Sequence, residues 1–141
     1  MTLQIILGSM MVIVTTIIQS GFTVAGVRAL RRRVSKEFIK SLWRSTLMLA
    51  LFVLFLATIL EVSMWAVLYL ALDAVRTLEE AAYFSMETFT TLGYGDITLD
   101  KDWRLLSSFE GANGLLMFGW STALIFAAVQ WIYLTRTQAP S

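Results

Sequence analysis

A short polar stretch, TLGYGD at residues 91–96, lies between long apolar segments of this chain. Two glycines and an aspartate are poor material for a helix. Gly93 and Gly95 permit left-handed backbone conformations, which let successive carbonyl groups point the same way. The chemistry on offer here is therefore that of backbone oxygens, and its use depends on the elements that hold the stretch in place.

The rest of the chain offers little to an enzyme that uses side-chain chemistry. It contains no Cys and no His, so disulfides, thiol chemistry and the usual zinc or haem sites are excluded. Of its 141 residues, 57% are hydrophobic and only 15% are charged, whereas a soluble domain of this size needs far more surface charge. The composition predicts a small integral membrane protein that is not an enzyme, has no cofactor and binds no nucleic acid.

Three segments are long and apolar enough to cross a bilayer, which takes about 20 residues in a helix. They run over about residues 3–27, 46–72 and 105–134. A cleaved signal peptide is the alternative for the first segment, but such a peptide carries positive charge ahead of its apolar stretch. Here the positive charge follows, which favours a transmembrane helix over residues 1–27.

The charges between the spans predict the orientation. Short loops rich in Lys and Arg stay in the cytoplasm, and basic residues gather between the first two spans. The loop over residues 73–104 is mainly acidic and is expected outside. The N-terminus would then lie outside and the tail 135–141 inside, in a plasma membrane or bacterial inner membrane. The bases concerned are Arg28, Arg31, Arg32, Arg33, Lys36, Lys40 and Arg44.

Residues 28–45 form a basic connection with an amphipathic pattern. Val34, Phe38 and Leu42 recur at helical spacing, which is typical of a helix lying along the inner membrane surface. The bases from Arg28 to Lys40 would attract anionic lipid there. The alternative is that these charges only set the topology.

The outer loop contains a short helix, predicted over residues 78–90. Thr77 followed by Glu80 fits a capping box at its start. At 1.5 Å per residue the helix spans roughly 20 Å, too short to cross the membrane but long enough to enter it halfway. Residues 91–96 would then be non-helical backbone at membrane depth, which is tolerated only where protein buries it or where it lines a water-filled cavity.

Residues 83–96, YFSMETFTTLGYGD, closely resemble the pore helix and selectivity filter of tetrameric potassium channels, including an aromatic pair at Tyr83 and Phe84. The resemblance implies an all-α membrane protein with three transmembrane helices, a re-entrant pore helix and an extended filter, assembled as a four-fold homotetramer that conducts K⁺ passively. It extends over residues 46–134, as outer helix 46–72, pore helix 78–90, filter 91–96 and inner helix 105–134.

The resemblance assigns ion binding to the filter backbone. In the family, carbonyl oxygens replace the water around the ion, so K⁺ would be the permeant ion rather than a cofactor. Leu92 departs from the Val or Ile that is usual in the family, and packing behind the filter is expected to be less stiff. The residues concerned are Thr91, Leu92, Gly93, Tyr94 and Gly95, with the Thr91 hydroxyl adding the innermost ring.

Two acids flank the filter, Glu87 in the pore helix and Asp96 after it. We expect their carboxyls to meet behind the filter and share a proton, because two carboxyls in contact do not both ionise easily. The pair would then tune collapse of the filter. The alternative is that Glu87 only caps a neighbouring amide.

Two further acids lie inside predicted spans, where an ionisable group is by default a functional candidate. Glu110, near the start of the third span, is expected to hydrogen-bond the back of the pore helix rather than to line the ion path. Glu61 is expected to face protein, toward Trp65 or the first span.

Small residues in the third span indicate where it could bend or face the pore. Gly114 is the nearest match to the hinge glycine that inner helices of the family carry, and Ser121 and Thr122 are candidates for lining the cavity. No span carries the regular bases of a voltage sensor, so any gate is expected within the membrane.

Two other functions fit the same architecture. One is a weakly selective cation channel, although channels of that kind usually lose the filter tyrosine or the second glycine, and Tyr94 and Gly95 are both present. The other is a non-conducting subunit or membrane adaptor.

Overall fold

The computed structural model describes residues 1–33 and 36–137, with their side chains apart from those of residues 29–44, 46, 132 and 135–137. Three long helices contain stretches long and apolar enough to span a membrane, namely Thr2–Arg28, Leu47–Ala71 and Arg104–Trp131. The chain is therefore an all-α integral membrane protein, as predicted. The helices of the described residues are α1 (Thr2–Arg33), α2 (Lys36–Ala71), α3 (Leu78–Phe89) and α4 (Arg104–Thr137).

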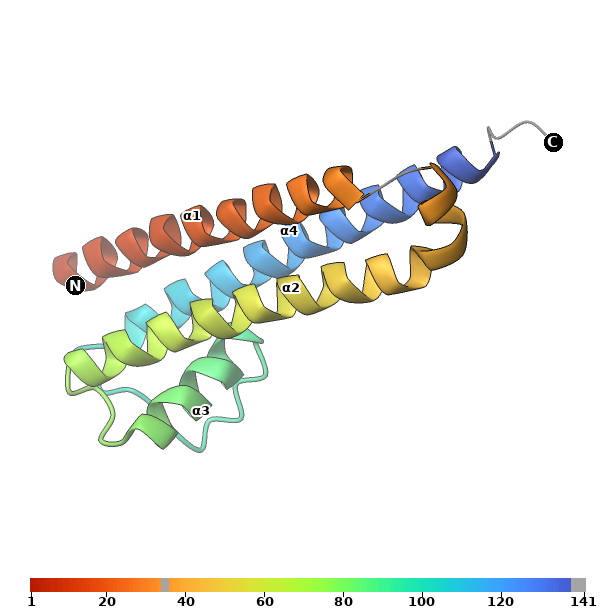
Figure 1. Cartoon of the computed structure of the whole chain (residues 1–141). Helices are drawn as coiled ribbons and strands as arrows, with labels where there is room; N and C mark the ends of the chain where they lie inside the picture. Colours follow the sequence, from red (N-terminus) through yellow and green to blue (C-terminus); the bar gives the residue numbers. More distant parts are fainter. Residues whose placement is uncertain (34–35, 138–141) are drawn as a thin grey trace.

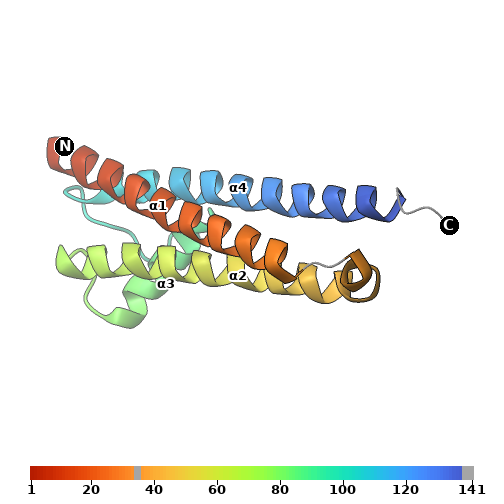
Figure 2. The same ribbon diagram turned by 45° about the horizontal axis from the view of Figure 1, so that its top comes forward.

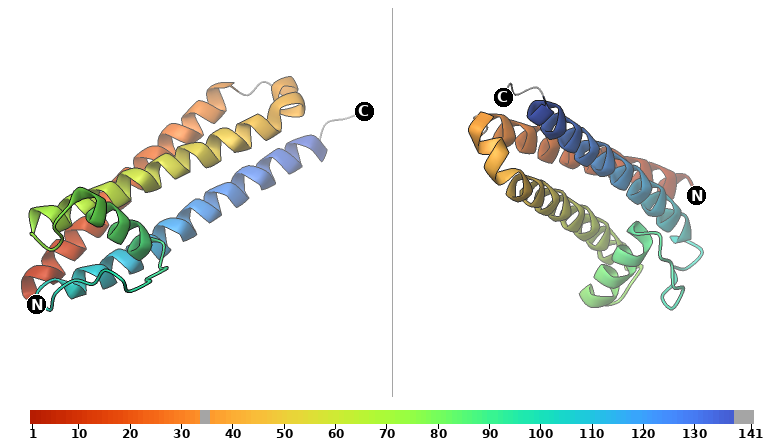
Figure 3. Two further views of the ribbon diagram at one scale, coloured as in Figure 1. Left: turned by 90° about the horizontal axis from the view of Figure 1, so that it is seen from below. Right: turned by 90° about the vertical axis from the view of Figure 1, so that its right-hand side faces the viewer.

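The three long helices lie side by side, with α1 and α4 running in the same direction and α2 in the opposite one (Figure 1). The short α3 and the segment that follows it lie at the end of the bundle that holds the N-terminus, and the C-terminus lies at the far end (Figure 1). Figure 2 shows α1 crossing the bundle on the side away from α3. Figure 3 shows α3 against the C-terminal end of α2 and the N-terminal end of α4.

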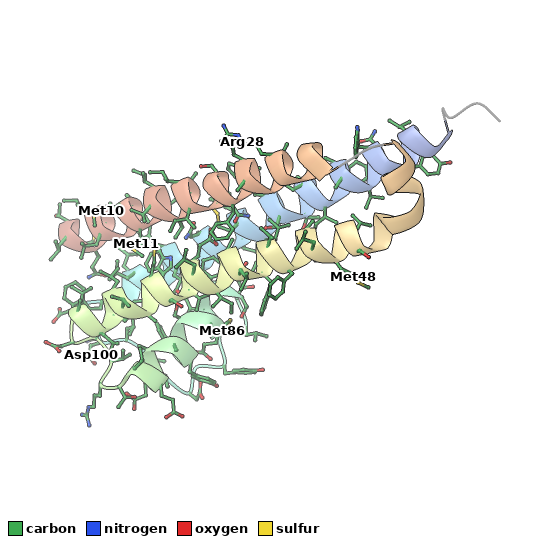
Figure 4. All side chains as sticks on the ribbon, in the orientation of Figure 1. Met10, Met11, Arg28, Met48, Met86 and Asp100 are labelled. Carbon is green, nitrogen blue, oxygen red and sulfur yellow. The ribbon has the colours of Figure 1, made fainter. Side chains whose placement is uncertain are left out.

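The helix ends differ from the sequence prediction mainly in the basic connection. α1 continues to Arg33 and α2 begins at Lys36, so most of residues 28–45 belongs to the ends of two long helices. This range contains neither Pro nor Gly, the residues that most readily end a helix. Arg28 points away from the bundle (Figure 4). The expected lipid contacts of Arg31, Arg32, Arg33, Lys36 and Lys40, and the amphipathic stripe, fall on side chains outside the described ones.

Local side-chain chemistry sets the start of α3. The Thr77 hydroxyl accepts a hydrogen bond from the Glu80 amide at 3.1 Å, and the Glu80 carboxylate accepts one from the Thr77 amide at 3.2 Å. This confirms the predicted capping box. At the other end, α3 ends at Phe89 with Thr90 as its C-cap, one residue short of the predicted range, because the backbone leaves the helical conformation at Thr91, where φ is positive.

The apolar core holds α3 in place against α2 and α4. Trp65, Tyr69, Phe89 and Leu106 are fully buried, and Phe84 meets the Tyr69 ring edge-on, with ring centroids 5.1 Å apart. From α1, the buried Met11 extends the same cluster, and it points from that helix toward the others (Figure 4). Because α3 is wedged in this core, the segment after Phe89 has a defined position.

Candidate functional site

The segment after α3 has an unusual backbone. The dihedral φ is positive at every second residue: 62° at Thr91, 56° at Gly93 and 78° at Gly95. Glycine reaches this left-handed region without steric conflict, but a β-branched threonine rarely does. The backbone is therefore strained at Thr91, whereas Gly93 and Gly95 adopt positive φ without strain. Strained backbone of this kind is concentrated at functional sites.

Successive amides of this segment face one residue of α3. The amides of Leu92 and Gly93 donate to the Glu87 carbonyl at 2.9 and 3.3 Å, and the amide of Tyr94 donates to the Glu87 carboxylate at 3.2 Å. The described chain has no cis peptide bond, so the carbonyl on the other side of each peptide plane points the opposite way. The carbonyl oxygens of Thr91, Leu92 and Gly93 therefore point away from Glu87.

These oxygens face the outside of the single chain. Residues 91–96 are all exposed, with Leu92 59% and Tyr94 69% exposed. A row of carbonyls on one exposed backbone offers oxygen ligands to a cation from one side only. A single chain cannot enclose the ion.

The two acids beside the filter do not pair. Glu87 accepts from the Tyr94 amide, whereas Asp96 accepts from the Tyr83 hydroxyl at 2.9 Å, and that hydrogen bond raises the pKa of Tyr83. The described residues show no hydrogen bond between the carboxyls, so the expected contact between the two acids was wrong. Each carboxyl instead accepts a hydrogen bond from an uncharged group, Glu87 from an amide and Asp96 from a phenol hydroxyl. The alternative, in which Glu87 caps an amide, is the arrangement present.

Behind α3, Glu110 is fully buried and joins three helices. The Tyr69 hydroxyl of α2 donates to its Oε2 at 2.6 Å, and Ser85 Oγ of α3 lies 2.5 Å from its Oε1. Ser85 Oγ is also 2.8 Å from the Val62 carbonyl oxygen of α2. Glu110 thus contacts the back of the pore helix, as expected. Its partners Tyr69 and Ser85 were missed, although a serine in the middle of a short apolar helix was a usable signal.

Gly114 has a packing role in this structure. A Cβ at this position would lie 1.9 Å from the Phe89 carbonyl oxygen, so only glycine lets the end of α3 approach α4 this closely. The ring of Phe89 also meets Phe118 edge-on at 5.8 Å between centroids. α4 is one continuous helix through this point. The close contact with Phe89 is the role that Gly114 has in this structure, and its role as a hinge stays a prediction.

Glu61 is as buried as Glu110 but lacks its contacts. Neither carboxyl oxygen of Glu61, nor Nε1 of Trp65, has a hydrogen-bond partner among the described residues. Glu61 faces protein, as expected, since it is fully buried. Of the two directions considered, toward Trp65 or toward the first span, the one toward Trp65 gives no hydrogen bond.

α1 is attached to α4 by a polar seam. Asn113 and Thr15 hydrogen-bond each other, with Asn113 Nδ2 2.8 Å from Thr15 Oγ1. Ser121 accepts from Gln19 at 2.8 Å, so it faces α1 and does not line a cavity as expected. The sequence analysis did not predict these contacts, although Thr15, Gln19 and Thr23, each one helical turn apart in the first span, were a signal. The other two contacts are Leu105 to Gln4 and Trp120 to Thr23.

Comparison with known proteins supports the reading of these residues as one module. A family model described as an ion channel matches residues 48–130, which is more than half of the chain. Characterised proteins and solved structures give no match. The matched range contains nearly all of the membrane-spanning part of α2, the whole of α3, residues 91–96 and most of α4, and the chain therefore belongs to the ion channel family.

Proposed function

We propose that this protein is a potassium-selective channel in which four copies surround a single ion path. The observation that carries the proposal is the row of amides from Leu92 to Tyr94, all turned toward Glu87. Their opposed carbonyls provide consecutive oxygens on one face. K⁺ gives up its hydration shell only where several oxygens replace the lost water at close range, without holding the ion too tightly.

The one-sided arrangement supports assembly with further copies. Each chain supplies one wall of oxygens from Thr91, Leu92, Gly93 and Tyr94, and the resemblance to tetrameric channels implies four walls. The exposed side chain of Leu92 would be covered by a neighbouring copy. Gly95 keeps the alternation of backbone conformations that ends the filter.

The arrangement of charge supports a defined orientation. The filter segment and the N-terminus share one end of the bundle, and the basic end of α1 and the basic start of α2 lie at the opposite end (Figure 1). Because basic loops stay in the cytoplasm, the filter would open to the outside of a plasma membrane or bacterial inner membrane. Anionic lipid would gather at the basic end.

The test is ion flux through purified protein in liposomes. We expect K⁺ efflux to exceed Na⁺ efflux strongly. Gly93→Ala should abolish K⁺ flux, because its φ of 56° strains any side chain. Gly21→Ala is the matched control, since a Cβ there meets no atom within 4 Å, and it should leave the flux unchanged.

Two results would contradict the proposal, each in favour of a different function. Equal K⁺ and Na⁺ flux through the wild type would indicate a weakly selective cation channel. No flux of either ion, from protein that is folded and inserted, would indicate a non-conducting subunit or adaptor.

A further inference from the structure

Three oxygen–oxygen contacts surround Glu110, and each needs one hydrogen. If Glu110 is ionised, only the two hydroxyl hydrogens of Tyr69 and Ser85 are present. Ser85 Oγ lies within hydrogen-bond distance of both the Val62 carbonyl oxygen and Glu110 Oε1, at 2.8 and 2.5 Å. A serine hydroxyl carries one hydrogen, and a carbonyl oxygen can only accept. The Ser85 hydrogen can serve only one of these two contacts, and the Val62 carbonyl has no hydrogen to offer, so a second hydrogen would have to reach the Ser85–Glu110 contact.

The other side of Glu110 does not supply that hydrogen. The Tyr69 hydroxyl donates to Oε2 at 2.6 Å, which uses the only hydrogen that Tyr69 has. With an ionised Glu110, one buried oxygen pair would meet lone pair to lone pair. With a protonated Glu110, the three contacts form a chain in which Tyr69 donates to Glu110, Glu110 to Ser85, and Ser85 to Val62. Every contact then has one hydrogen.

The surrounding helices offer no positive charge to an ionised Glu110. Residues 2–27 of α1 contain no acid or base, and residues 47–71 of α2 contain only Glu61 and the phenol of Tyr69. On α3 the nearest acid, Glu87, is turned toward the Tyr94 amide. On α4 itself the nearest base, Arg104, is exposed at the helix start. A buried carboxylate without a cation is strongly disfavoured.

We propose that Glu110 is a protonated carboxylic acid that positions the pore helix by donating its hydrogen to Ser85. The Tyr69 hydroxyl of α2 orients the acid by donating to Oε2. Ser85 in turn donates to the Val62 carbonyl of the α2 backbone. The carboxyl thereby holds α3 at a set distance from α2 and α4, and the filter segment follows α3. The positioning role rests on the proposed channel function, whereas the protonation does not.

The first test compares substitutions of Glu110 in the reconstituted protein. Glutamine has the shape of the protonated acid, and its amide can donate to Ser85 while its oxygen accepts from Tyr69. Glu110→Gln should therefore keep wild-type thermal stability and K⁺ flux within about twofold of wild type. Glu110→Ala should lower both, the flux by about tenfold, because the buried Tyr69 hydroxyl loses its acceptor and Ser85 loses its contact with α4. Glu110→Gln as impaired as Glu110→Ala would overturn the proposal.

The second test reads the protonation directly and does not require conduction. The infrared spectrum of the wild type minus that of Glu110→Gln, at neutral pH, should contain a protonated carboxyl C=O band. The same difference for Glu79→Gln, an exposed acid at the start of α3, is the control and should contain only carboxylate bands. A Glu110 difference that contains only carboxylate bands would overturn the protonation. The expected band together with unchanged flux in Glu110→Ala would overturn the positioning role.

Discussion

Two acids of the same kind, Glu61 and Glu110, lie fully buried in membrane-spanning helices. Glu110 contacts hydroxyls from two other helices, while Glu61 has no hydrogen-bond partner among the described residues. The Val62 carbonyl, one position after Glu61, belongs to the Glu110 network, so Glu61 is next in sequence to a member of that network and still lacks a partner. Burial alone does not give an intramembrane acid a role.

The difference arises from α3. This helix brings the Ser85 hydroxyl to Glu110, which thereby gains a partner that Glu61 lacks. A buried acid without a hydrogen-bond partner loses its contacts with water and gains no replacement. Such burial is unfavourable. The contrast predicts that a substitution that disturbs the packing of α3 lowers the stability of the protein more than a substitution that removes Glu61.

The largest effect is expected for Gly114→Ala. The new Cβ would lie 1.9 Å from the Phe89 carbonyl oxygen, so α3 must move away from α4, and Ser85 with it. Overpacking of this kind costs about 1–3 kcal/mol. A thermal unfolding scan in detergent should show a clear loss of stability, and the protonated Glu110 band should change.

Gly111→Ala is the matched control for this variant, because its Cβ would meet the Thr88 carbonyl oxygen at an ordinary 3.6 Å. It should retain wild-type stability. If Gly114→Ala and Gly111→Ala behave alike, α3 does not depend on the close contact, and the contrast between the two acids has another cause.

An intermediate effect is expected for Tyr69→Phe. This change removes one of the two hydroxyl partners of Glu110. Glu110 would then resemble Glu61, which has no partner among the described residues, more closely. The loss should be about 0.5–1.5 kcal/mol, as for a typical hydrogen bond. In a Glu110→Ala background the same change should cost markedly less, since the partner is already gone. Equal losses in both backgrounds would show that Tyr69 acts through packing alone.

The smallest effect is expected for Glu61→Leu, which replaces a partnerless carboxyl with an apolar group of similar size. Stability should be unchanged or slightly higher, because no hydrogen bond is lost. The same substitution at Glu110 is the comparison, and it should be destabilising. A marked loss of stability or flux in Glu61→Leu would reveal a partner for Glu61 and remove the contrast.

The elements near the filter were largely predictable because local rules govern them. The capping box of Thr77 and Glu80 depends on residues three apart, and the positive φ values at Gly93 and Gly95 follow from the lack of a side chain. The pairing of Glu87 with Asp96 was predicted wrongly. Spacing placed both acids beside the filter, but their partners, the Tyr94 amide and the Tyr83 hydroxyl, depend on side-chain directions in three dimensions.

Hydropathy was enough to predict the three spans, and local residue patterns were enough to predict the short helix and the glycine-dependent backbone after it. Which face of each long helix meets its neighbours required the fold. Lipid is as apolar as a protein core, so the pattern of apolar residues around a spanning helix carries little information about its inner face. That choice is made by close backbone contacts such as Gly114 on Phe89, and by polar pairs such as Thr15 with Asn113.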